Sequence, residues 1–132
     1  MSLKGAVTTQ KTILLVDDDA LVRRVVRRQL ELIQFDVVEA SNGAAAVAIL
    51  RDREDILALV SDVDMPIMNG LELAQTVALQ WPALPVVLVS GRRIEVEDRS
   101  SLPTNLMMLA KPLSADIISQ VLVALAPDPA AA

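Results

Sequence analysis

The sequence predicts a doubly wound α/β fold, in which helices cover both faces of a parallel sheet. Short apolar runs alternate with longer segments of helical spacing, and this strand–helix order repeats five times between residues 12 and 126. The runs are apolar throughout, which is typical of parallel strands that are buried on both faces. The chain has 132 residues, 53% of them hydrophobic, which fits one compact domain with a sizeable core.

The first repeat begins with a strand at residues 13–16, where four apolar residues follow one another. A helix is predicted over residues 20–33, because apolar residues recur there every three or four positions. Asp19 directly precedes this helix and is predicted to cap its N-terminus. The apolar positions of the helix are Val22, Val25, Val26, Leu30 and Ile33.

The second repeat joins a strand at residues 36–40 to a helix at residues 42–51, and a third strand follows at residues 57–61. The helix after it has a clear start signal. Asn69 can cap it, and Glu72 three residues later completes a capping box. Because proline cannot continue a helix, Pro82 should end it near Trp81.

Two more strands are predicted at residues 86–89 and 106–110. The segment 91–101 is charged with little apolar periodicity, so we expect a short or mobile helix that ends before Pro103. Ser114 can cap a last helix that runs to residue 126. These elements form one domain over residues 12–126, flanked by a disordered or tag-derived N-terminus and a disordered tail or linker stub, residues 1–11 and 127–132.

The composition excludes several kinds of chemistry. The chain has no cysteine and no histidine, which excludes disulfides, thiolate and imidazole catalysis and most zinc sites. The lack of cysteine also fits a cytoplasmic location. A net charge of −5 makes direct nucleic-acid binding unfavourable, since phosphates would be repelled. The apolar runs are far too short for a membrane span.

Unusual polar residues follow the predicted strands at their carboxyl ends. In a parallel sheet these ends converge on one edge, where ligands bind. Carboxylates gathered there repel one another unless a cation lies between them, and a purely oxygen donor set favours a hard ion such as Mg²⁺. A carboxylate is already ionised at neutral pH and needs no base to attack phosphorus. Any single aspartate at a strand end is more often a helix cap than a ligand, so the prediction rests on the residues occurring together. The residues are Asp17, Asp18, Asp19, Asp62, Asp64, Ser90 and Lys111.

Four segments carry a resemblance to a known family. LLVDDD at 14–19, SDVDMPIMNG at 61–70, VVLVSG at 86–91 and LAKPL at 109–113 resemble the signatures of response-regulator receiver domains. FDVVEASNG at 35–43 is similar to the family's second strand and following turn. The resemblance covers residues 12–126 and implies a flavodoxin-like (βα)5 fold, a three-layer sandwich with strand order 2-1-3-4-5.

The resemblance also implies roles for individual residues. Asp62 matches the phosphoacceptor, and Asp17 and Asp18 match the acidic pair that holds Mg²⁺, with Mn²⁺ as a substitute. Asp62 and the backbone carbonyl of Asp64 would complete the protein ligands of that ion. Two further residues would contact the phosphoryl group, namely Ser90 and Lys111.

In this family the phosphoryl donor is a histidine kinase or a histidine phosphotransfer protein. The resemblance implies a switch in which Ser90 follows the phosphoryl group and alters the face of helix 4, strand 5 and helix 5, which could also form a homodimer. Three positions depart from the family. Met108 replaces a frequent aromatic residue, Asp64 adds a charge beside the acceptor, and Gln34 replaces a frequent glycine and puts a left-handed helix cap in doubt.

Some alternatives stay open from the sequence. The arginines of the first helix are either a solvated face or a surface that docks the phosphoryl donor. The chain resembles receivers of hybrid histidine kinases, but a non-switching docking scaffold would share the fold. Asp62 and Asp64 also resemble the DxD motif of haloacid-dehalogenase-type phosphatases, in which this strand usually lies near the N-terminus. The arginines are Arg23, Arg24, Arg27 and Arg28.

Overall fold

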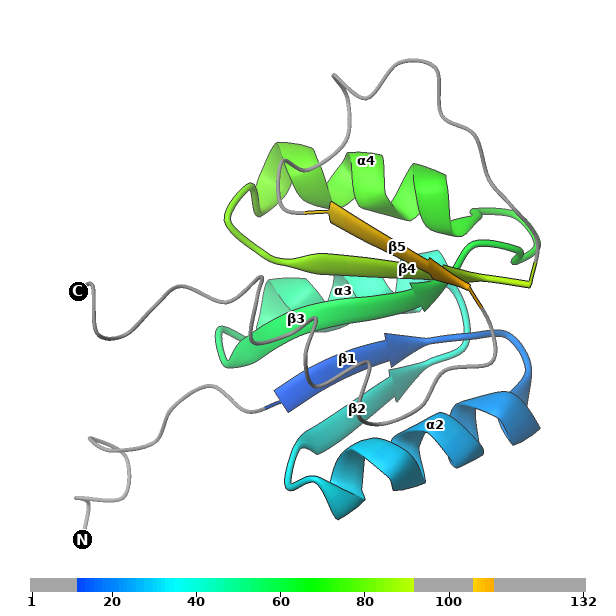
Figure 1. Ribbon diagram of the computed structural model, residues 1–132. Coiled ribbons are helices and arrows are strands. Elements are labelled where there is room, and N and C mark those ends of the chain that lie inside the picture. Colours follow the sequence, from blue (N-terminus) through cyan, green and yellow to red (C-terminus); the bar gives the residue numbers. More distant parts are fainter. Residues whose placement is uncertain (1–11, 92–105, 111–132) are drawn as a thin grey trace, which may run out of the picture.

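The computed structural model describes residues 12–91 and 106–110 and contains one five-stranded parallel sheet (Figure 1). The strand order is β2-β1-β3-β4-β5, which confirms the predicted doubly wound topology. The chain reverses direction across the sheet between β1 and β3, so the switch point of the fold lies at their carboxyl ends. The strands are β1 Thr12–Val16, β2 Asp36–Ala40, β3 Ile56–Asp62, β4 Val86–Ser90 and β5 Leu106–Ala110.

The strand register aligns the carboxyl ends. Val16 of β1 is level with Ser61 of β3, and the next residue along, Asp62, is level with Val89 of β4. Ser90 in turn is level with Ala110 of β5. The polar residues that follow these positions therefore emerge along one edge of the sheet.

Helices cover both faces of the sheet (Figure 1). Alternate residues of β1 point to opposite faces, so Leu14 and Val16 pack in one core while Ile13 and Leu15 pack in the other. α2 contributes Leu30 to the second of these cores, and α3 and α4 pack on the first. The helices are α2 Ala20–Leu32, α3 Gly43–Asp52 and α4 Gly70–Gln80.

Side chains cap the three helices at their N-termini, as predicted for two of them. The carboxylate of Asp19 accepts hydrogen bonds from the first turn of α2. Asn69 and Glu72 form the reciprocal capping box of α4, and Trp81 is its C-cap. Asn42, which the sequence prediction placed inside α3, is instead its N-cap and accepts from Ala45 N at 2.8 Å. The other bounds agree with the predictions to within one residue at each end, and those of β2 and β5 match them fully.

The sequence put a left-handed cap at the end of α2 in doubt, but the structure contains that cap. Gln34 adopts the left-handed conformation at φ 75°, although it is not glycine. Its N–H donates to Glu31 O at 3.0 Å, and Phe35 N–H donates to Leu30 O at 3.1 Å. These two bonds define a Schellman motif, and Phe35 packs in the same core as Leu30, as such motifs favour. Tertiary packing thus keeps Gln34 in a backbone conformation that its own intrinsic preference disfavours.

Several predicted features lie outside the described residues. They are the helices over 91–101 and 114–126, both chain ends and Lys111. Within the described residues, no helix is both long and apolar enough to cross a membrane.

Candidate functional site

Three aspartates meet at the carboxyl edge of the sheet. One carboxylate oxygen from each of Asp17, Asp18 and Asp62 lies within 4.8 Å of the other two. Asp17 and Asp62 are buried, with 5% and 7% of their surface exposed, whereas Asp18 is exposed. Three negative charges this close repel one another strongly. Oxygen donors, partial burial and one open side together fit a hard divalent cation such as Mg²⁺.

The turn after β1 sorts its three acids into different positions. Asp17 N–H extends the strand ladder by donating to Ala40 O at 3.2 Å. The Oδ1 atom of Asp17 accepts from Asp19 N at 2.9 Å, which ties the turn together. Asp19 is occupied as the helix cap, as its sequence position predicted. Asp17 and Asp18 are therefore the two acids of this turn that face the cluster.

The loop after β3 orients the third acid, Asp62, which is the last residue of that strand. Val63 N–H donates to Val89 O at 3.0 Å and continues the sheet past Asp62. Gly70 N–H returns to Val63 O at 2.9 Å and closes the loop. Asp64 is exposed, and its N–H makes a long 3.4 Å hydrogen bond to Asp62 Oδ1. The loop thus orients Asp62 through its own backbone.

The same loop contains a strained turn. Ile67 has φ 70°, and Met68 N–H donates to Pro66 O at 2.8 Å across it. This pattern matches a γ-turn of the rare left-handed kind, which is unfavourable for a β-branched residue. The side chain of Ile67 is fully exposed.

The remaining predicted site residues divide into two cases. Ser90 is buried at the end of β4, on the same edge as Asp62. Lys111 lies outside the described residues, but it directly follows Ala110, the last residue of β5 at this edge.

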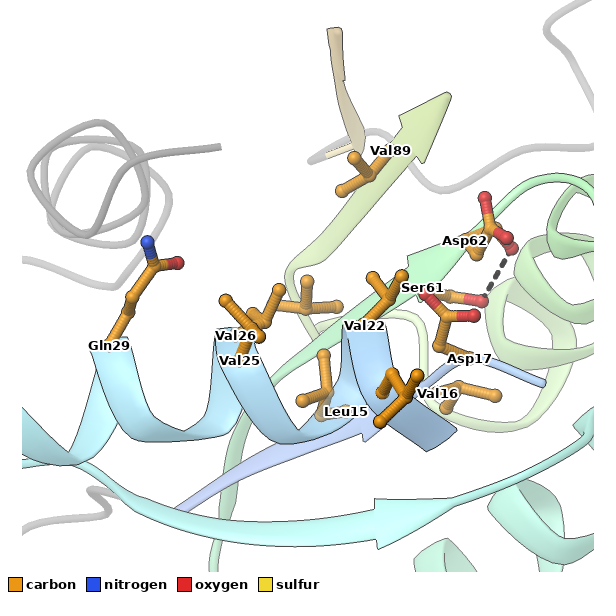
Figure 2. A pocket seen from close by; sticks show the side chains of 12 residues that line it. Leu15, Val16, Asp17, Val22, Val25, Val26, Gln29, Ser61, Asp62 and Val89 are labelled. Carbon is orange, nitrogen blue, oxygen red and sulfur yellow. Dashed lines mark hydrogen bonds between the residues drawn. The ribbon is translucent and has the colours of Figure 1, made fainter. Parts of the chain in front are cut away.

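An apolar cavity of about 410 Å³ lies between α2 and the sheet, with Asp17 and Asp62 at one end (Figure 2). Ser61 is fully buried beside them and donates its hydroxyl to Asp62 O at 2.9 Å. Valines and leucines form most of the remaining lining. The apolar wall lowers the local dielectric constant, so charge interactions at the acidic cluster are stronger than in open water.

Sequence reasoning missed an ion-pair network beside this cluster. Arg23 Nε donates to Glu39 Oε1 at 2.7 Å, and Arg27 Nη1 donates to Glu39 Oε2 at 2.6 Å. Arg23 Nη1 also donates to the backbone O of Asp17 at 2.7 Å. The hydrogen bond from Arg27, followed by that from Arg23, holds the pKa of Glu39 below its usual value, although burial opposes this. The available signal was Glu39, an acid inside β2, whose other acid, Asp36, only begins the strand.

Comparison with known proteins identifies the family of this site. The family model for the response regulator receiver domain matches residues 13–122. A chemotaxis protein CheY homolog from Campylobacter jejuni is 31% identical over 114 residues, which cover 83% of this chain and 88% of the relative. The sensor histidine kinase RcsC of Escherichia coli is 32% identical over 111 residues, covering 83% of this chain but 12% of the kinase.

A solved structure agrees with the fold. Chemotaxis protein CheY4 of Vibrio cholerae superimposes with a TM-score of 0.77 at 23% identity, covering 89% of this chain and 99% of that one. The architecture and its acidic edge define a doubly wound α/β domain with a site at the topological switch point. The chain belongs to the response regulator receiver domain family. It is a phosphoacceptor domain of two-component signalling, and its family implies a histidine kinase or phosphotransfer partner.

Proposed function

We propose that Asp62 accepts the phosphoryl group and that Asp17, Asp18 and Asp62 hold Mg²⁺, with the backbone carbonyl of Asp64 as a further ligand. The observation that carries the proposal is the convergence of three carboxylate oxygens within 4.8 Å. Of the three acids, Asp62 is buried at the end of the central strand β3, whereas Asp17 and Asp18 lie in the turn after β1. Asp62 is thus the acid best placed to be a fixed nucleophile.

The reaction is an in-line displacement at phosphorus. A carboxylate oxygen of Asp62 forms the new bond, the bond from phosphorus to the donor's imidazole nitrogen breaks, and that nitrogen keeps the electron pair. Bound Mg²⁺ would supply neutralisation of the phosphoryl oxygens. Asp17 and Asp18 hold the ion, and no general base is needed because a carboxylate nucleophile has no proton to lose when it attacks phosphorus. The chain can therefore catalyse its own phosphorylation, and later hydrolysis, without histidine.

Ser90 and Lys111 recognise the product in this proposal. The Ser90 hydroxyl donates to a phosphoryl oxygen, and the Lys111 ammonium pairs with another. The movement of Ser90 shifts a pre-existing equilibrium and alters the face that contains β5. Met108, half-buried against the core beside α4, takes the place of an aromatic residue in this coupling.

The donor protein docks on α2 in this proposal. The network described above occupies Arg23 and Arg27, so the docking surface consists of the exposed residues beside them. Within the described part of the chain, neither Arg24 nor Arg28 forms an ion pair. This mixed surface, which begins in the first turn of α2 directly after the acidic turn, fits an amphipathic helical partner with acidic residues. Its residues are Leu21, Arg24, Val25, Arg28 and Leu32.

The first experiment measures intact mass after incubation with acetyl phosphate and Mg²⁺. The wild-type chain should gain one phosphoryl group, and chelation of Mg²⁺ or the substitution Asp62→Asn should abolish the gain. Gain without Mg²⁺, or an undiminished gain in Asp62→Asn, would contradict the assignment.

The same preparation separates the alternatives. A non-switching scaffold would gain no phosphoryl group from either acetyl phosphate or a phosphorylated histidine donor. A phosphatase of the haloacid-dehalogenase type would hydrolyse p-nitrophenyl phosphate with multiple turnovers, and we expect no such turnover here.

A further inference from the structure

Arg23 connects the acidic cluster to the neighbouring strand. Its guanidinium donates through Nη1 to Asp17 O and through Nε to Glu39 Oε1, both at 2.7 Å. The side chain is 17% exposed and that of its partner Glu39 is 26% exposed, so the bonds are shielded from water. One side chain of α2 therefore links the turn after β1 to β2.

The network is held from its outer side as well. Arg27 binds the second oxygen of Glu39 at 2.6 Å, and the exposed Glu31 binds Arg27 at 3.1 Å. Both carboxylate oxygens of Glu39 are thus occupied, which fixes the acceptor that Arg23 needs. A planar guanidinium can serve two acceptors in fixed directions at once, whereas a lysine ammonium is a compact point charge on a flexible stem.

We propose that Arg23 is a positioning residue for the metal site, acting by fixing the turn that carries Asp17 and Asp18. The inference rests on the proposed Mg²⁺ site. Asp17 is held at its N–H by Ala40 O, at its carboxylate by Asp19 N and at its carbonyl by Arg23. Of these three restraints, only the last depends on a side chain outside the turn. Loss of the Arg23 bond would remove this restraint from the peptide that joins Asp17 to Asp18.

Positioning and simple charge predict opposite effects on Mg²⁺ binding. A cation so near a divalent ion repels it, so if Arg23 acted through its charge alone, Arg23→Gln would tighten Mg²⁺ binding and Arg23→Lys would leave it unchanged. If Arg23 acts by positioning, both substitutions weaken binding. We expect the dissociation constant to rise by about tenfold, the lower end of the usual effect of removing a group that orients a metal ligand.

The experiment is titration calorimetry of wild-type, Arg23→Gln and Arg23→Lys chains with MgCl₂ at constant ionic strength. Arg53→Gln is the matched control, because it removes an arginine–aspartate pair at the opposite end of β3. Circular dichroism melts accompany each titration, and Arg23→Lys keeps the inference testable if Arg23→Gln fails to fold. The Mg²⁺ concentration for half-maximal labelling by acetyl phosphate should rise in parallel, with the rate restored at saturating Mg²⁺.

Each result has a defined meaning. Weaker Mg²⁺ binding in both Arg23 variants, with Arg53→Gln unchanged, supports the positioning role. Unchanged or tighter binding in both would overturn that role while leaving the proposed function intact. A wild-type chain that binds no Mg²⁺ would overturn the proposed function and this inference together.

Discussion

Glu39 accepts hydrogen bonds from both Arg23 and Arg27 in the ion-pair network beside the acidic cluster. Its negative charge should therefore stabilise the folded chain. Arg27 and Arg23 lower the pKa of Glu39 in the folded chain. A lowered pKa means that the contribution is complete above the ordinary glutamate pKa of about 4.3 and is lost as the pH falls through the folded value. We expect Glu39→Gln to reduce the free energy of unfolding by about 1 kcal/mol at neutral pH, with the difference vanishing in acid.

Urea unfolding of both chains across this pH range checks the prediction. Glu31→Gln is the control, since its pair with Arg27 is more exposed and should contribute about 0.3–0.5 kcal/mol. A difference between wild type and Glu39→Gln that persists unchanged in acid would mean that packing, not charge, is the contribution of Glu39.

Gly70 is a second residue with a sharp expectation. A Cβ atom there would lie 2.5 Å from Asp62 O and 2.9 Å from Val63 Cα, so the backbone at Asp62 and Val63 would have to move. We expect Gly70→Ala to reduce the free energy of unfolding by about 1–3 kcal/mol, as overpacking commonly does. It should also slow the labelling of Asp62 by acetyl phosphate, measured by intact mass.

Gly91→Ala is the matched stability control, because a Cβ atom at Gly91 meets no described atom within 4 Å. Equal unfolding free energies for the two alanine variants would show that the close approach at Gly70 has no energetic effect.

At the residue scale, the acids of the site could be predicted and their surroundings could not. Asp17, Asp18 and Asp62 were predictable because strand ends and motif spacing are local properties of the chain. The Arg23–Glu39 bond joins residues 16 apart on different elements, so it depends on how α2 packs across β2. The sequence alone could not distinguish Arg23 and Arg27 from a wholly solvated or docking face. The roles of Asp62, Ser90 and Lys111 remain predictions.

The cap of α2 gives a prediction for an element. Gln34 is held at φ 75°, a conformation that costs a non-glycine residue about 1–2 kcal/mol. Glycine loses this strain but gains freedom in the unfolded chain, which offsets part of the benefit. We therefore expect Gln34→Gly to increase the free energy of unfolding by about 0.5–1 kcal/mol, measured by urea denaturation. Gln34→Ala is the control and should not stabilise, because alanine keeps the strain.

A destabilised Gln34→Gly chain would contradict this account and would indicate that the side chain of Gln34 itself contributes to the cap. The case also illustrates a limit of prediction for elements. The bounds of α4 were predictable because Asn69, Glu72 and Pro82 are local signals. The end of α2 was not, since its left-handed residue is imposed by the packing of Phe35 and Leu30 rather than by its own preference.

For the whole molecule, Mg²⁺ binding should couple to folding. The three acids are close only in the folded chain, so the ion stabilises that state, by about 2.7 kcal/mol at a hundredfold excess over its dissociation constant. We expect the Tm to rise with Mg²⁺ and to return on chelation. Asp18→Asn should reduce the rise, whereas Asp36→Asn, at the opposite edge of the sheet, should not. A rise of the same size in Asp18→Asn would place the stabilising ion elsewhere.

The overall architecture was largely predictable because two patterns of apolar residues in the sequence indicated its strands and helices. Unbroken apolar runs indicated buried parallel strands, and three-to-four spacing indicated the helices between them. The order β2-β1-β3-β4-β5 came from the family resemblance rather than from the periodicities. Neither pattern contains information on the apolar cavity beside Asp17 and Asp62, because the cavity depends on how far α2 stands from the sheet.

The most direct test of the central assignment locates the phosphoryl group on the chain. Borohydride reduces the acyl phosphate of an aspartate to homoserine, which fragment mass spectrometry can assign to one residue. After labelling with acetyl phosphate and Mg²⁺, we predict homoserine at position 62 and unmodified aspartate at Asp17, Asp18 and Asp64. Homoserine at any of those three positions, with Asp62 unmodified, would contradict the assignment of Asp62 as the phosphoacceptor.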